Sequence, residues 1–270
     1  MSSLSPQALE VIKNYLHLPF SGQNISCPYF NNRRARLRGG LRALIGKGSP
    51  EDIVEEATII SLREKINFNK LTDEELKKFL IDKKIGIDCS GLVYHILDAE
   101  LKAKGLGNLQ KILKRPWFKN PIRKLLIKLR PIENTGVGTF NHEVNSFEVK
   151  LSEIQPGDLI IIIGAGIKQD YNHILLVSSV IARSPQDDEA IPNKNGIATP
   201  RSSEVRNDTV IQYCHSFQYP NDGQYNHGVR QETITITDPN KNLLEQSWSE
   251  PQMQEYTRKA KECKIKRLKI

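Results

Sequence analysis

Hydrophobic and polar positions follow two different rhythms along this chain, and the change divides it into two parts. Residues 6–17 carry apolar side chains at helical spacing. Ser49 followed by Pro50 and two acidic residues is typical of a helix start. A second start is predicted where Thr72 and Glu75 form a capping box ahead of apolar positions. We therefore expect the first 85 residues to be helical.

The second half of the chain has short β-rich runs separated by turn residues. These runs cover residues 159–163, 173–181, 209–215 and 229–237, with a helix at 251–261 and a closing strand at 264–268. Successive strands joined by turns predict an antiparallel meander, so the expected fold class is α+β. The stretch 182–208, rich in Pro, Asn, Ser and Asp, predicts a long surface insertion.

The length and cysteine content restrict the class of protein. The chain has 270 residues, of which 38% are hydrophobic, enough for a substantial core. Its four cysteines have no close pair, which argues against a disulfide framework or a zinc site. No histidine pair has helical spacing with an acidic partner, so we predict no metal and no cofactor.

Targeting signals are not apparent near the start of the chain. Glu10, Lys13 and His17 interrupt the first twenty residues, and the longest apolar run, 159–163, is too short to span a bilayer. We therefore expect a cytoplasmic protein, with export by a non-classical route as the alternative.

Positive charge is concentrated in one stretch of the chain. The net charge is +8, and residues 101–130 contain ten Lys or Arg and no acidic residue. A solvated helical face is one interpretation. We favour contact of the segment from Lys102 to Arg130 with an anionic polymer or membrane surface, because a solvated face usually mixes both signs. The smaller basic clusters at 33–42 and 258–269 lack aromatic residues at base-stacking spacing, so nucleic acid is not an expected partner.

The strongest chemical signal is the segment Asp88-Cys89-Ser90-Gly91, which apolar residues follow at helical spacing. Cys89 is therefore expected at a helix N-terminus, where the unpaired N–H groups and the helix dipole favour thiolate and could bind an oxyanion. Asp88 would cap the helix, and the small Ser90 and Gly91 would leave room for a substrate. From this pattern alone, a buried structural cysteine and a nucleophile are both open.

A thiolate nucleophile needs a proton acceptor, usually a histidine on a neighbouring strand. His173 opens a buried strand directly after a polar turn. His215 ends the next predicted strand and is placed to orient the ring of His173. Side chains alternate along a strand, so Cys214 and His215 should point to opposite faces, one into the core and one toward the site.

Four motifs, taken in order, resemble the NlpC-type cell-wall hydrolases, which are papain-like cysteine peptidases. The motifs are Gly-Ile-Asp-Cys-Ser-Gly-Leu-Val at 86–93, Leu-Ser-Glu-Ile-Gln-Pro-Gly-Asp-Leu-Ile at 151–160, Asn-His-Ile at 172–174 and Tyr-Cys-His-Ser at 213–216. The resemblance implies Cys89 as nucleophile, His173 as base and His215 as orienting residue. It also implies cleavage of peptide bonds in peptidoglycan stem peptides, with a peptide or peptidoglycan fragment as partner.

The resemblance implies a papain-like fold with N-terminal helices packed on an antiparallel sheet. We expect residues 1–85 to form a helical extension and 86–270 the catalytic domain, with insertions at about 101–140 and 182–208. The family usually has a Pro-Tyr motif shortly before the cysteine, whose tyrosine supports the oxyanion, and that motif is missing here. Tyr29 is a candidate for this tyrosine displaced by a helical insertion, and Asp88 and Ser90 are further oxyanion or substrate candidates.

Two other functions remain open. The same three residues could transfer an acyl group to an amine or lipid instead of to water. A protein without catalytic activity could also keep the fold and hold an anionic polymer on its basic surface, although an intact set of Cys89, His173 and His215 argues against that.

Overall fold

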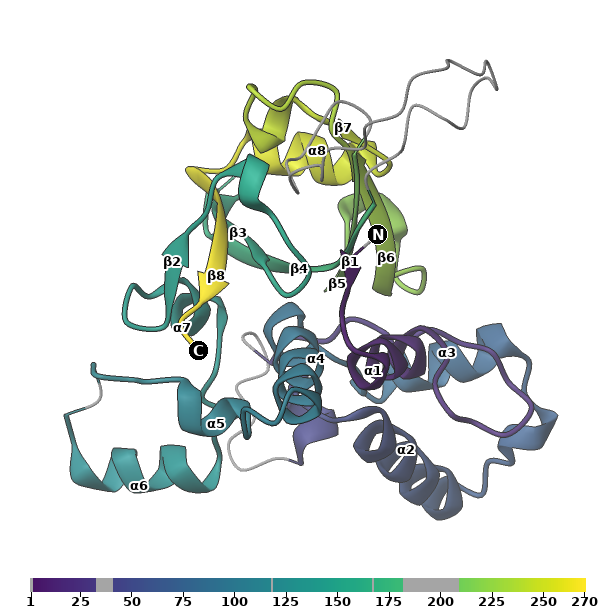
Figure 1. The fold of residues 1–270 in the computed structure, drawn as a ribbon. Coiled ribbons are helices and arrows are strands. Elements are labelled where there is room, and N and C mark those ends of the chain that lie inside the picture. The colour runs from purple at the N-terminus through teal and green to yellow at the C-terminus, as the bar shows by residue number, and fades with distance from the viewer. Residues whose placement is uncertain (1, 33–40, 118, 167, 182–208) are drawn as a thin grey trace, which may run out of the picture.

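The computed structural model describes residues 2–32, 41–117, 119–166, 168–181 and 209–270 (Figure 1). The insertion predicted at 182–208 lies outside the described residues. The α-helices are α1 (Pro6–Leu16), α2 (Pro50–Glu64), α3 (Asp73–Asp82), α4 (Cys89–Ala103), α5 (Leu109–Ile112), α6 (Pro121–Leu129), α7 (Val137–Asn141) and α8 (Pro251–Arg258). The strands are β1 (Ser2–Ser3), β2 (Ser146–Glu148), β3 (Leu159–Ala165), β4 (Tyr171–Ile181), β5 (Val210–Phe217), β6 (Gly228–Thr235), β7 (Ser247–Trp248) and β8 (Glu262–Leu268).

The strands form one curled antiparallel sheet in the order β2-β8-β3-β4-β5-β6-β7, with β1 pairing with β4. The predicted α+β class is confirmed. Strands β3 to β7 lie next to one another in chain order, which is the antiparallel meander that the sequence predicted. The last strand, β8, does not extend that meander but returns to pair with β2 and β3. Sequence order alone does not indicate this return, because it depends on which edge of the sheet is left unpaired.

The helix starts that the sequence indicated are present. Ser49 and Asp52 form a reciprocal capping box at the start of α2, with Pro50 in its first turn. Thr72 and Glu75 do the same for α3. These caps satisfy backbone N–H groups that have no partner inside the helix, so they fix where each helix begins.

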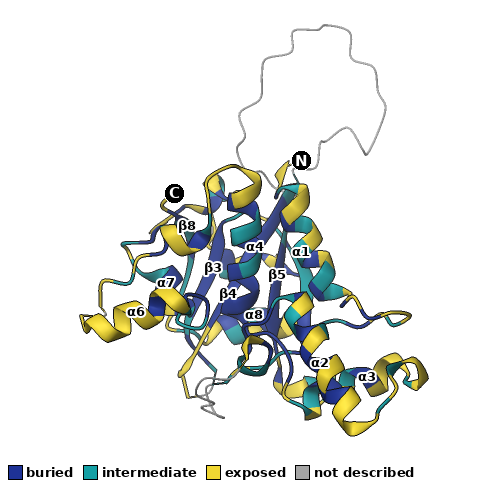
Figure 2. Cartoon of the chain, turned by 90° about the horizontal axis from the view of Figure 1, so that it is seen from below, coloured by how far each residue is buried: buried dark blue, intermediate teal, exposed yellow. Residues whose placement is uncertain are grey.

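Two hydrophobic cores lie on the two faces of the sheet. On one face, side chains of α1 and α4 pack against alternate residues of the central strands, including Ile174, Leu176 and Cys214. On the other face, the intervening residues, including Leu175 and Tyr213, pack inside the curl under α8. Figure 2 shows the buried strands β3, β4 and β5 beneath α4 and α1. The strands are thus buried on both faces, which explains their nearly continuous apolar runs.

The N-terminal segment shares the core of the rest of the chain. Strand β1 pairs with β4, and α1 packs along α4. The hydroxyl of Tyr15 donates to the carbonyl of Gly48 at 2.8 Å. No helix within the described ranges is long and apolar enough to cross a membrane.

Candidate active site

Cys89 is the first residue of α4, as predicted, and its side chain is buried. Asp88 caps the helix, and its Oδ1 accepts the backbone N–H of Gly91 at 2.6 Å. Gly91 does not serve to admit a substrate. A Cβ there would lie 2.7 Å from the carbonyl oxygen of Gly46, so its small size lets the helix start pack against the preceding chain.

A buried cation supports the residue before the nucleophile. Lys47 Nζ donates to Asp88 Oδ1 at 2.8 Å, to Ser90 Oγ at 2.6 Å and to the carbonyl of Thr135 at 2.9 Å. Ser90 Oγ in turn donates to Asp88 Oδ1 at 2.9 Å. The side chains of Asp88 and Ser90, both expected as oxyanion or substrate candidates, therefore hold the helix start in place. These bonds engage Asp88 Oδ1 and Ser90 Oγ within the protein, which leaves the backbone N–H groups of this segment as the candidate donors to a substrate.

The two predicted histidines meet on adjacent strands. His173 lies near the start of β4 and His215 near the end of β5, and both are buried. Their ring atoms His173 Nε2 and His215 Nδ1 are 3.1 Å apart, a hydrogen bond. Cys214 points to the opposite face and joins the helix-side core, as strand alternation predicted. The pairing brings together residues that are 42 positions apart in the chain.

Glu250, at the start of α8, extends the pair of histidines. Its Oε2 lies 3.4 Å from His215 Nε2, within ion-pair distance but outside hydrogen-bond geometry. Its other contacts are strong: Tyr219 donates to Oε2 at 2.9 Å and Arg230 Nη1 to Oε1 at 2.9 Å. Burial would raise the pKa of Glu250, but the contacts with His215, Tyr219 and Arg230 outweigh burial and lower it. Glu250 is therefore an anion facing His215.

This chain of contacts favours one tautomer of each histidine. An anion beside His215 Nε2 stabilises a proton on that nitrogen, which leaves His215 Nδ1 as an acceptor. His173 Nε2 then donates to it, so the lone pair of His173 lies on Nδ1. Burial and the neighbouring His215 lower the pKa of His173 well below its usual value. His173 is thus held neutral with a free acceptor nitrogen, the state that a general base requires.

Cys89 lies against the strand that carries His173. Helix α4 packs on β4, and Cys89 shares the helix-side core with Ile174, the residue after His173. Burial raises the pKa of Cys89 to about 12, and the charge of Asp88 adds to the rise, whereas Lys47 and the backbone N–H groups of Ile174 and Ser90 oppose it. The lowered pKa expected from the helix N-terminus is therefore not found, because desolvation of a buried thiolate exceeds the stabilisation by the helix start.

Tyr29 reaches the site despite its distance in sequence. Residues Tyr29 and Ile87 form a parallel β-bridge, and Phe30 donates to the carbonyl of Ile87 at 3.2 Å. Burial raises the pKa of Tyr29, and the charge of Cys89 raises it further. Asn31 Nδ2 donates to this hydroxyl at 3.2 Å, which leaves the hydroxyl proton for another acceptor. The bridge to Ile87, two residues before Cys89, brings Tyr29 beside the start of α4, so Tyr29 stays a candidate oxyanion donor.

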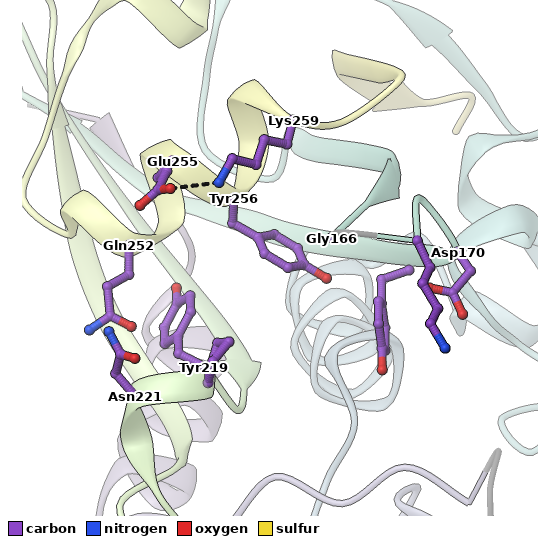
Figure 3. Close-up of a pocket in the computed structure, with 11 residues that line it drawn as sticks. Gly166, Asp170, Tyr219, Asn221, Gln252, Glu255, Tyr256 and Lys259 are labelled. Atoms are coloured by element: carbon purple, nitrogen blue, oxygen red, sulfur yellow. Dashed lines mark hydrogen bonds and ion pairs between the residues drawn. The ribbon is translucent and has the colours of Figure 1, made fainter.

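Two adjoining cavities open beside these residues. The larger, of about 920 Å³, is lined by residues including Tyr29, His173 and His227. The smaller, of about 580 Å³, lies between Tyr219, Asp170 and α8. Tyr256 lines both, and Figure 3 shows it reaching from α8 into the space between Tyr219 and Asp170. Together they form a tyrosine-rich cleft that reaches His173.

Several site residues were not found by sequence reasoning. Lys47, Glu250 and Tyr256 come from segments with no recognisable motif, and only the fold brings them to the site. The Tyr256 hydroxyl is buried with no hydrogen-bond partner among the described residues, and the charge of Cys89 contributes to its raised pKa. His227 lines the larger cavity, is buried, and its Nδ1 accepts the backbone N–H of Tyr29 at 3.2 Å.

Comparisons with protein-family models, with curated proteins and with solved structures found no match to this chain.

Proposed function

We propose that this protein is a cysteine hydrolase that cleaves amide bonds through an acyl-enzyme, on a papain-like scaffold of the NlpC type. One observation carries the proposal. Cys89 starts a helix that packs against the strand bearing His173, and the far nitrogen of His173 is bonded by His215. A nucleophile, a neutral base and a group that orients the base are thus contributed by three separate elements, which is the arrangement that thiol hydrolases need.

The first half of the reaction acylates Cys89. His173 Nδ1 removes the thiol proton while the sulfur attacks the carbonyl carbon, so the C–S bond forms and the carbonyl electrons move to oxygen. The N–H groups at the start of α4 and the hydroxyl of Tyr29 are the candidate donors to this oxyanion. When the C–N bond breaks, His173 returns the proton to the leaving amine, and an S-acyl enzyme remains.

Water completes the cycle. His173 takes a proton from water as its oxygen attacks the thioester, the C–S bond breaks, and the proton returns to the sulfur. Because burial raises the pKa of Cys89 and lowers that of His173, the resting pair is a neutral thiol and a neutral imidazole. The proton therefore moves during attack, by general-base catalysis, and not in a preformed ion pair.

The proposed substrate is a peptide of the bacterial cell wall. The resemblance to NlpC-type hydrolases supports peptidoglycan stem peptides, and the cavity beside His173 is large enough for a short peptide. Lys84 and His227 line that cavity and could receive a carboxylate of such a peptide.

The decisive test incubates the protein with peptidoglycan stem peptides and reads the products by mass spectrometry. We expect cleavage by the unchanged protein and by Cys263→Ala, which alters a cysteine on β8, but none by Cys89→Ala. A Cys89 adduct with the mass of an S-acyl group should accumulate early in the reaction. Products joined to an added amine or lipid, in place of free acid, would identify an acyltransferase. Unchanged cleavage by Cys89→Ala would refute the assignment of the nucleophile.

A further inference from the structure

Helix α6 exposes an apolar face at the edge of the molecule. Ile122, Leu125, Leu126 and Leu129 are 70%, 58%, 51% and 67% exposed. Their spacing of three and four residues puts all four on one stripe of the helix. Figure 1 shows α6 set apart from the sheet, and Figure 2 shows it mostly exposed. Isolated exposed apolar residues need no explanation, but a continuous stripe of four on one short helix does.

The helix is attached to the rest of the chain by its opposite side. Ile127 is buried at 8% exposure, and at about 100° per residue it lies roughly opposite the centre of the apolar stripe. Asn120 caps the helix start, and Gln110 Nε2 donates to the carbonyl of Lys128 at 2.9 Å. The apolar stripe is therefore presented outward by a helix that is already formed.

Cations flank the apolar stripe. By the same helical geometry, Lys128 lies on one side of it and Arg123 and Arg130 lie on the other, whereas Lys124 lies farther round the helix, next to Ile127. Acidic side chains from other segments pair with some of the cations in the segment 101–130, as Glu133 does with Arg130. Neither Lys124 nor Lys128 forms an ion pair with another described residue. The segment itself contains no acidic residue that would offset the positive charge.

We propose that α6 binds an anionic lipid bilayer, lying in the headgroup region with its apolar stripe toward the acyl chains. An apolar stripe flanked by Lys and Arg is the pattern of helices that lie in the membrane interface, and each cation adds attraction to anionic lipid. A soluble polyanion would use the charges but leave four apolar side chains in water. A second copy of the chain would bring two strongly basic segments together. The lipid surface alone matches both the charge and the apolar stripe, and the inference does not depend on the proposed hydrolase activity.

Co-sedimentation with vesicles tests the proposal on the full chain. Vesicles of phosphatidylcholine alone are compared with an equimolar mixture of phosphatidylcholine and phosphatidylglycerol. We expect binding to the mixture only. Leu125→Ser/Leu129→Ser should weaken the partition coefficient by at least ~10-fold, because two buried leucines are lost from the interface. The matched control is Ile59→Ser/Leu62→Ser, which changes two equally exposed apolar residues of α2 and should bind as the unchanged protein does.

A double charge-reversal variant of α6 separates the electrostatic contribution to vesicle binding from that of the apolar stripe. Lys124→Glu/Lys128→Glu should also weaken binding by at least ~10-fold, whereas Lys70→Glu/Lys241→Glu, which reverses exposed lysines elsewhere, should have a much smaller effect. Circular dichroism confirms that each variant is folded.

Four results would overturn the proposal. If Leu125→Ser/Leu129→Ser bound vesicles as well as the unchanged protein does, the surface would act by its charge only. If both the unchanged protein and this variant bound poly-L-glutamate equally, the partner of α6 would be a soluble polyanion. If the unchanged protein bound no vesicles but associated with itself, and Leu125→Ser/Leu129→Ser did not, the apolar stripe would be an interface with a second copy of the chain. Binding to neither vesicle would exclude a lipid surface.

Discussion

Replacing Glu250 by Gln tests whether the acid controls the protonation of both histidines. Arg230 donates to Oε1 of Glu250, so the amide oxygen of Gln is expected to occupy that position. The amide NH₂ would then face His215 Nε2, where the carboxylate oxygen now lies at 3.4 Å. A donor at this place favours the His215 tautomer with its proton on Nδ1. His173 Nε2 would then have to accept, which puts the proton of His173 on Nδ1 and removes the base.

The size of the effect follows from this reversal. In serine proteases, an amide in place of the carboxylate that orients the catalytic histidine lowers kcat by ~10⁴. Here the amide acts through one additional ring, so we expect a loss of about 10²–10³ in kcat, or about 3–4 kcal/mol in the barrier. Stability should fall by only about 1–3 kcal/mol, because Arg230 keeps its ion pair with Asp222 at 2.7 Å.

Three readouts distinguish this effect from a general disturbance of the fold. Stem-peptide turnover and alkylation of Cys89 by iodoacetamide should both slow, and the ¹⁵N shifts of His215 should report the exchanged tautomer. Glu262→Gln, at an exposed carboxylate on β8 paired with Lys264, should change neither rate. If Glu250→Gln turned over substrate at the normal rate while His215→Ala did not, the acid would not set the tautomers and the reasoning would be wrong.

Three further predictions concern the surroundings of Cys89. Tyr29→Phe should lower kcat by up to about 10² with little change in KM, because the hydroxyl is a donor to the oxyanion; an unchanged kcat would leave the α4 amides as the only donors. Lys47→Met should reduce the free energy of unfolding, measured in urea, by about 3–5 kcal/mol, because it leaves Asp88 as an unpaired buried charge. The control Lys83→Met, which breaks the partly exposed ion pair with Glu64, should reduce it by less than about 1 kcal/mol. Stability should be constant just above pH ~6.5 and fall below it. The pKa values of His95, His173 and His227 are lowered chiefly by removal of the rings from water, so the unfolded chain takes up protons that the folded chain does not. A stability curve that rose on acidification below that pH would contradict this.

The secondary structure was largely predictable because its signals are local. Capping residues such as Ser49 and Thr72 bond to N–H groups two or three positions away, and apolar periodicity reports directly which face is buried. The predictions were weaker where an element depends on distant partners. The short strands β1, β2 and β7 have too few residues for a pattern, and β8 finds its place only because the edge of β3 is open.

The sequence by itself determined the residue types of the site: a cysteine at a helix start and two histidines on successive strands. Each has a local motif, so no tertiary information was needed to select them. Only the tertiary structure decided their chemistry. It buries Cys89, which raises its pKa against the effect of the helix start, and it brings Glu250, Lys47 and Tyr256 to the site from segments with no motif of their own. Protonation depends on desolvation and on charges a few ångströms away, and those neighbours are set by how the chain packs and not by their distance along it.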